Sequence, residues 1–163
     1  MTDAFELVVG LIVIIVLGFG VGPILHRTTQ KDRPAPPSGV EPATWQAIFN
    51  LGASGKWIGF FERLLTFGIF WLGAYVALAG WLAFKVAAKW ESWSNIVQVP
   101  SSLPNTEELE YFRARKELGS WIFSRFLIGT LLNALIGIVG AEIGKKSWDV
   151  VSFLAKSVSQ AST

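Results

Sequence analysis

Three apolar stretches, separated by polar segments, dominate the hydrophobic pattern of this chain. The central one, Leu64 to Phe84, carries no charge and lies between Arg63 and Lys85. About 20 apolar residues at roughly 1.5 Å per residue suffice for a helix to cross a hydrocarbon core of about 30 Å. The pattern therefore predicts one continuous membrane-crossing helix, extending with its flanks over about 57–90, around which the rest of the chain is arranged.

The first apolar stretch, Leu7 to Leu25, follows two acidic residues and precedes His26 and Arg27. A cleaved signal peptide has the reverse order, with its basic residues before the apolar run. Residues 1–27 are therefore predicted to form an uncleaved first transmembrane helix whose N-terminus lies outside the cytoplasm.

The third apolar stretch, about 118–144, has one unusual face. Its small or polar residues recur every fourth position, which places them on one side of a helix. These residues are Arg125, Gly129, Asn133, Gly137 and Ala141. The spacing indicates a helix-packing face or a pore-facing one.

The segments between these stretches complete an all-α, integral membrane fold with three transmembrane helices and short interfacial helices. Residues 28–44 contain several prolines, which favour an extended linker. Residues 45–146 form a membrane domain in which a polar loop and helix join the two later spans, and a short helix presenting Trp45, Ile48 and Phe49 lies at its start. Residues 147–163 are predicted to form a C-terminal surface helix and tail.

The composition agrees with a membrane protein, since 52% of the residues are hydrophobic, 16% are charged and the mean hydropathy is +0.46. The chain has no cysteine and a single histidine, His26, so neither a thiolate nor an imidazole metal site is expected. The net charge is +2, but the basic residues lie beside the apolar stretches. This arrangement favours membrane lipids over nucleic acid as partners.

The sequence has no motif that indicates a reaction. It lacks a phosphate-binding loop with lysine, an HExxH helix and a GxSxG turn. We therefore predict no enzyme activity, no catalytic residue and no cofactor.

The distribution of Lys and Arg predicts the orientation through the positive-inside rule. With the N-terminus outside, three spans place the C-terminus in the cytoplasm. The cytoplasmic side then receives Arg27, Lys31, Arg33, Lys56, Arg63, Lys145, Lys146 and Lys156, and the outer side receives Lys85, Lys89, Arg113, Arg115 and Lys116.

Three charged residues border the central stretch, namely Glu62, Arg63 and Lys85. A charge that faces hydrocarbon costs from about 2.5 to above 10 kcal/mol, so each needs water, headgroups or a partner. At the ends of a single span, long side chains reach the headgroups. The three are therefore predicted to be interfacial charges, with Glu62 paired with a neighbouring basic residue.

Two functions fit the face that runs from Arg125 to Ala141. In a homo-oligomeric assembly, several copies meet on this face, and a ring of Arg125 side chains at the mouth of a pore or channel favours anions. In the alternative, the protein is an accessory or scaffolding subunit that packs its small-residue faces against a larger membrane complex.

Three short pieces resemble a known family. They are GKWIGFFERLL (Gly55–Leu65), LAFKVAAKWE (Leu82–Glu91) and RFLIGTLLNAL (Arg125–Leu135). Together, over about residues 55–141, they resemble the membrane-spanning tail of an uncharacterised bacterial inner-membrane family that is known only as a domain of unknown function. The first span and the C-terminal tail depart from the family pattern. The resemblance implies a location in the bacterial inner membrane and two paired helices, and it implies no activity.

Overall fold

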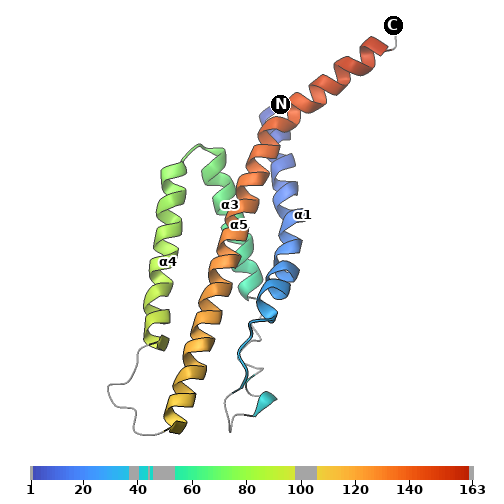
Figure 1. Cartoon of the computed structure of the whole chain (residues 1–163). Helices are drawn as coiled ribbons and strands as arrows, with labels where there is room; N and C mark the ends of the chain where they lie inside the picture. The colour runs from blue at the N-terminus through green and yellow to red at the C-terminus, as the bar shows by residue number, and fades with distance from the viewer. Residues whose placement is uncertain (1, 37–40, 44, 46–53, 98–105, 162–163) are drawn as a thin grey trace.

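The computed structural model describes residues 2–36, 41–43, 45, 54–97 and 106–161. This part of the chain is all-α, as predicted, and its four long helices lie side by side with alternating directions (Figure 1). They are α1 (Thr2–Gln30), α3 (Ser54–Trp71), α4 (Tyr75–Val97) and α5 (Thr106–Ala161). Ile48 and Phe49 of the predicted surface helix lie outside the described residues.

Helix α5 is the centre of the molecule. It packs against α1, α3 and α4, whereas α3 makes smaller contacts with α1 and α4. The core between α1, α3 and α5 is formed by Ile14, Phe67 and Ala141, with Leu11, Leu64 and Ile136 packed around it. The prediction that the chain is arranged around residues 64–84 is therefore wrong, because the other helices all pack against the third apolar stretch.

The central apolar stretch is a helical hairpin, and the prediction of one continuous helix over 57–90 is also wrong. Gly73 has φ +71°, a left-handed conformation that suits glycine. Its N–H donates to the carbonyl of Phe70 at 3.1 Å, and the N–H of Ala74 donates to that of Ile69 at 2.9 Å. These two bonds form a Schellman cap, which ends α3 before α4 begins.

A close approach of two helices fixes α1 on α5. A Cβ atom added to Gly140 would lie 2.2 Å from Cγ2 of Ile14, and one added to Gly144 would lie 2.7 Å from the carbonyl oxygen of Glu6. The two glycines form a GxxxG pair, a pattern that lets membrane helices approach closely.

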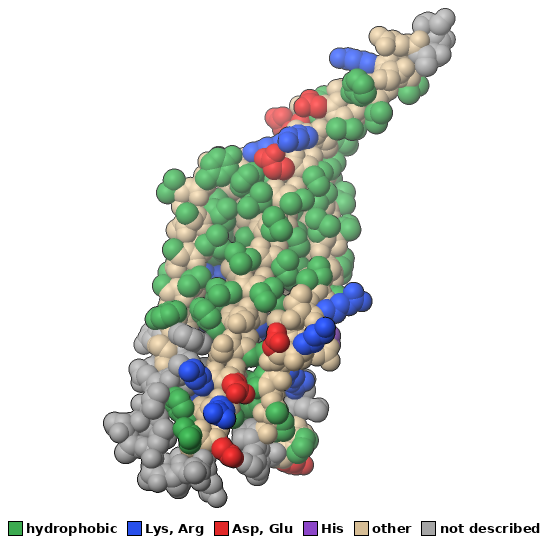
Figure 2. Space-filling view, in the orientation of Figure 1, with side chains coloured by type: hydrophobic (Ala, Val, Ile, Leu, Met, Phe, Trp, Pro, Cys, Tyr) green, Lys and Arg blue, Asp and Glu red, His purple; other side chains and the backbone are tan. Residues whose placement is uncertain are grey.

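The described surface carries a broad apolar band between two charged ends (Figure 2). On α1 the exposed side chains of this band are large, and they include Val8, Ile12, Val16 and Phe19. Two helical stretches, Thr2–Gln30 and Leu109–Val158, are long and apolar enough to span a membrane. Within the described residues no third span is detected by length and composition, since the hairpin divides the central stretch into two shorter helices.

Helix α5 continues without interruption to Ala161, and its last turns project beyond the bundle (Figure 1). The predicted surface helix of residues 147–163 is thus the end of a longer helix. Both termini lie at the same end of the molecule. This position differs from the predicted topology, in which three spans place the termini on opposite sides.

Candidate functional site: an ionic cluster inside the apolar band

Helices α3, α4 and α5 bring charged and polar side chains together around Glu62. One carboxylate oxygen of Glu62 accepts a hydrogen bond from the ammonium group of Lys85, and the other accepts one from Nδ2 of Asn133 at 3.0 Å. Oδ1 of Asn133 accepts a hydrogen bond from the guanidinium group of Arg63 at 2.7 Å. Asn133 thus links a carboxylate to a guanidinium. We call Glu62, Arg63, Lys85, Thr130 and Asn133 the ionic cluster.

Lys85 has two further neighbours on α5. Its ammonium group donates to Oγ1 of Thr130 at 2.8 Å and lies 5.1 Å from the ring centroid of Phe126. Glu62, Thr130 and Asn133 are all buried, with exposed fractions of 8%, 6% and 5%. The Lys85 and Glu62 side chains therefore form an ion pair that the protein shields from its surroundings.

The ionic cluster lies near the middle of the apolar band. Along α5, Asn133 is about midway between Arg125 and Glu142, roughly 12 to 14 Å from each at about 1.5 Å per residue. Glu62 precedes the Gly73 turn by about as many residues as Lys85 follows it, so the hairpin places both at one depth. In a continuous helix these two residues would lie at opposite ends. The hairpin thus brings Glu62, Arg63 and Lys85, which the sequence predicts at the two ends of one span, into a single paired cluster.

Gly18 of α1 accommodates the Arg63 side chain. A Cβ atom added to Gly18 would lie 2.7 Å from Nε and 2.9 Å from Nη2 of Arg63. The guanidinium group therefore lies directly on the backbone of α1, between that helix and Asn133. This contact connects the ionic cluster to α1, the one long helix that contributes no residue to the cluster.

The face predicted on the third apolar stretch lies largely against helices of the same chain. Asn133 belongs to the ionic cluster, and Ala141 is completely buried in the core. A Cβ atom added to Gly137 would lie 2.8 Å from Cβ of Thr66, so α3 crosses α5 at this glycine. The nearest atom to a Cβ on Gly129 would be Cδ2 of Leu25 on α1, at 3.6 Å.

Arg125, the last residue of that face, is half-buried near one end of the band. Its guanidinium carbon lies 5.2 Å from the ring centroid of Trp121, one turn earlier on α5. A pore between copies requires the whole face at the centre of an assembly. In this chain, α1 and α3 already occupy that place. Most of this face is therefore covered by helices of the same chain.

Sequence analysis missed the pairing of Lys85 with Glu62, the part played by Thr130 and the close approach at Gly140 and Gly144. The GxxxG pair formed by Gly140 and Gly144 is a sequence pattern that indicates a close contact between helices. The pairing of Lys85 with Glu62 depends on recognising Gly73 as a helix end, and a glycine inside a charge-free run is common in membrane helices as well.

No family model, curated protein or solved structure matches this chain. The resemblance of residues 55–141 to a bacterial inner-membrane family therefore stays a prediction. Among the described residues, no group of three or more His, Asp or Glu side chains is placed to hold a metal ion.

Proposed function

We propose that the protein is a small multi-pass protein of the bacterial inner membrane in which α1 and α5 cross the bilayer and the α3–α4 hairpin crosses it twice between them. The large exposed side chains of α1 support this placement, since Val8, Ile12, Val16 and Phe19 are each more than half exposed. So does the ionic cluster, because charges inside an apolar band are tolerated when they are paired within the protein. The proposal includes no catalytic role and no cofactor.

The proposal changes the predicted orientation. Four crossings leave both termini on one side, which agrees with their shared position at one end of the bundle. The opposite end is richer in basic residues, and the positive-inside rule places that end in the cytoplasm. Its basic residues include Arg27, Lys31, Arg33, Arg113, Arg115 and Lys116. Both termini then lie outside the cytoplasm.

Reporter fusions test this orientation. Alkaline phosphatase, which is active only outside the cytoplasm, is expected to be active when fused to the C-terminus after Thr163 and inactive when inserted in the segment 98–105. A fluorescent protein at the same two positions is expected to show the reverse pattern. The opposite pattern at the two positions would contradict this orientation.

The proposed function is self-association through the outward face of α4. The middle of the face that lies opposite Lys85 on the helix consists of Ala79, Gly80, Ala83 and Ala87, all exposed, and the larger exposed side chains of Val76 and Trp90 lie at its two ends. The outward face of α1, in contrast, carries Val, Ile and Phe side chains. In lipid, small residues favour close helix packing, whereas large aliphatic ones suit acyl chains. This contrast within one molecule is the observation that carries the proposal.

The ionic cluster determines which face of α4 points outward. Lys85 points toward Glu62 and Thr130, and Leu78 is buried on the same side of the helix. With a charged residue paired inside the bundle, rotation of α4 about its axis would break that pair in an apolar environment. The small-residue face is therefore held away from α5, where a second copy can reach it.

Disulfide cross-linking tests the interface directly, because the chain has no native cysteine. Single variants Ala83→Cys and Ala87→Cys, oxidised in native membranes, are expected to give mostly dimers of twice the chain mass. The matched control is Val16→Cys, which lies on the outward face of α1 and is 60% exposed. It is expected to give few dimers.

Equal dimer yields from all three variants would contradict the proposal. A product of Ala83→Cys that contains one copy of this chain and one of a different protein would favour the accessory-subunit role, in which the same face binds a larger complex.

A further inference from the structure

The last turns of α5, residues 147–161, extend beyond the bundle and separate apolar from polar side chains. We call this segment the extension. Its main apolar face recurs every three or four residues and is 44 to 71% exposed; it consists of Val150, Val151, Leu154 and Val158. The opposite face carries Asp149, Ser152, Lys156 and Gln160. Phe153 lies at the border between the two faces. The extension is therefore an amphipathic helix.

The apolar face of the extension lies on the side of α5 that packs against α1. Gly140 and Gly144 meet α1, and Leu154 and Val158 follow these two glycines by about four helical turns each. The extension leans toward the side of the bundle on which α1 lies (Figure 1). Its charged side chains lie along its upper edge and its hydrophobic ones along its lower edge, toward the bundle (Figure 2). The apolar face is thus directed toward the surroundings of α1.

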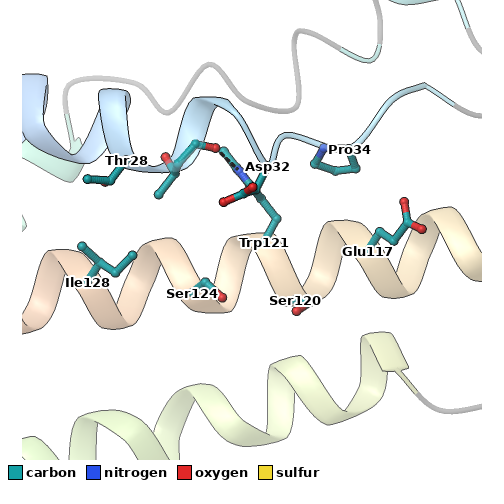
Figure 3. Close-up of a pocket in the computed structure, with 9 residues that line it drawn as sticks. Thr28, Asp32, Pro34, Glu117, Ser120, Trp121, Ser124 and Ile128 are labelled. Atoms are coloured by element: carbon teal, nitrogen blue, oxygen red, sulfur yellow. Dashed lines mark hydrogen bonds between the residues drawn. The ribbon is translucent and has the colours of Figure 1, made fainter.

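A hollow lies between α1 and α5 at each end of the bundle, and the two linings differ. The hollow at the basic end includes polar side chains from both walls, among them Asp32, Glu117, Ser120 and Ser124 (Figure 3). The hollow beside the extension is a groove of about 560 Å³ with a mainly apolar lining, which includes Phe5, Val9, Ile143, Val150 and Val151. This groove joins the extension to the outward face of α1. A continuous apolar surface therefore runs from the apolar band onto the extension.

The serines of the extension also suit a place where little water is present. The hydroxyl groups of Ser147, Ser152 and Ser157 each donate to a backbone carbonyl three or four residues earlier, at 2.7 to 3.0 Å. Such bonds satisfy the hydroxyl donors within the helix itself. The extension can therefore lie at the boundary between headgroups and acyl chains without leaving these donors unpaired.

We propose that the extension lies on the outer surface of the membrane beside α1, with its apolar face among the acyl chains and its polar face in water. Trp148, whose ring packs on Phe5 with centroids 5.8 Å apart, then lies at headgroup depth, where tryptophan is common. The charges of Asp149 and Lys156 balance, so burial of apolar side chains holds the extension there. A second copy fits this face less well, because coiled coils need about three or four heptads.

This inference rests on the membrane placement and orientation proposed above and is independent of the α4 contact. Spin labels on single cysteines test it, since the chain has no native cysteine. In liposomes, labels at Leu154→Cys and Val158→Cys are expected to collide several times more often with oxygen, which concentrates in acyl chains, than with a water-soluble nickel chelate. Labels at Ser152→Cys and Lys156→Cys are expected to show the reverse. The pattern should be the same with and without phosphatidylglycerol in phosphatidylcholine liposomes.

The two collision rates distinguish lipid from the other surroundings. Frequent collisions with the nickel chelate at all four positions would place the extension in water and overturn the proposal. Low rates with both reagents at Leu154 and Val158 would show a covering protein chain and overturn it as well. A label at Val16→Cys on α1 reports the membrane placement separately. If that label is exposed to lipid while the extension is in water, only the present inference fails.

A double variant tests whether the apolar face holds the extension on the membrane. With the label at Val158, Val151→Glu/Leu154→Glu is expected to raise the rate of collision with the nickel chelate several-fold. The control Ser152→Glu/Lys156→Glu adds carboxylates to the polar face and is expected to leave that rate unchanged. Unchanged elution volumes in size-exclusion chromatography show that both variants fold. Equal rates in the two variants would contradict the proposal.

Discussion

Replacement of Glu62 by alanine is expected to lower the free energy of unfolding by about 3 to 5 kcal/mol, the usual cost of leaving one partner of a buried ion pair alone. In the Glu62→Ala variant, Lys85 and Arg63 lie near the middle of the apolar band with no carboxylate beside them. The measurement is reversible unfolding of the purified protein in mixed micelles of mild detergent and dodecyl sulfate.

The matched control is Glu142→Ala. Glu142 pairs with Lys146 one turn later on α5 at 3.4 Å, but the Lys146 side chain is 74% exposed and that of Glu142 is 44% exposed, so this pair lies at the surface. Such pairs contribute at most about 1 kcal/mol. The double variant Glu62→Leu/Lys85→Met removes both charges of the buried pair and is expected to be more stable than Glu62→Ala. Equal losses for Glu62→Ala and Glu142→Ala would show that Glu62 is not buried with Lys85.

A second large effect is expected from Gly140→Val, which should separate α1 from α5. Even a Cβ atom at this position would lie 2.2 Å from Cγ2 of Ile14, and a branched side chain needs still more space. Overpacking of this kind costs about 1 to 3 kcal/mol or more, because the backbones must move apart. The same unfolding assay measures the loss.

Two further variants control for the change of residue type. Gly22→Val introduces the same side chain into α1 where nothing lies within 4 Å of the added Cβ, so a much smaller loss is expected. Ile14→Ala, combined with Gly140→Val, removes the atoms that the new side chain meets and should restore part of the stability. A loss for Gly22→Val as large as that for Gly140→Val would contradict the close approach.

The sequence predicts the all-α class and the two long apolar helices well, because an uninterrupted apolar run of sufficient length has few alternatives. It predicts the central stretch poorly. A charge-free run of about 20 residues fits one crossing by length, whereas the structure turns at Gly73. The turn depends on a Schellman cap, which a single glycine signals only weakly.

Because the sequence predicts a continuous helix through Gly73, it also places the charged residues of the candidate site wrongly relative to one another. With a continuous helix, Glu62 and Lys85 lie near opposite membrane surfaces, where water solvates them. With a hairpin they lie at one depth, and Asn133 and Thr130 of α5 complete their hydrogen bonds. Gly129, Asn133 and Gly137 are four positions apart in the sequence, and they lie on one face of α5, as this spacing predicts. The spacing itself contains no information about which helix covers that face, and here α3 and α1 do so.

The central claim is therefore the hairpin that brings Lys85 to Glu62 inside the apolar band. The most direct test is a distance measurement by pulsed electron spin resonance between spin labels on Lys56→Cys and Lys89→Cys, near the two open ends of the hairpin. The structure predicts a distance far shorter than the length of one continuous helix, since the two arms of the hairpin are antiparallel and Lys85 of one arm contacts Glu62 of the other. A distance near 50 Å, the length of one continuous helix over these residues at about 1.5 Å per residue, would contradict it.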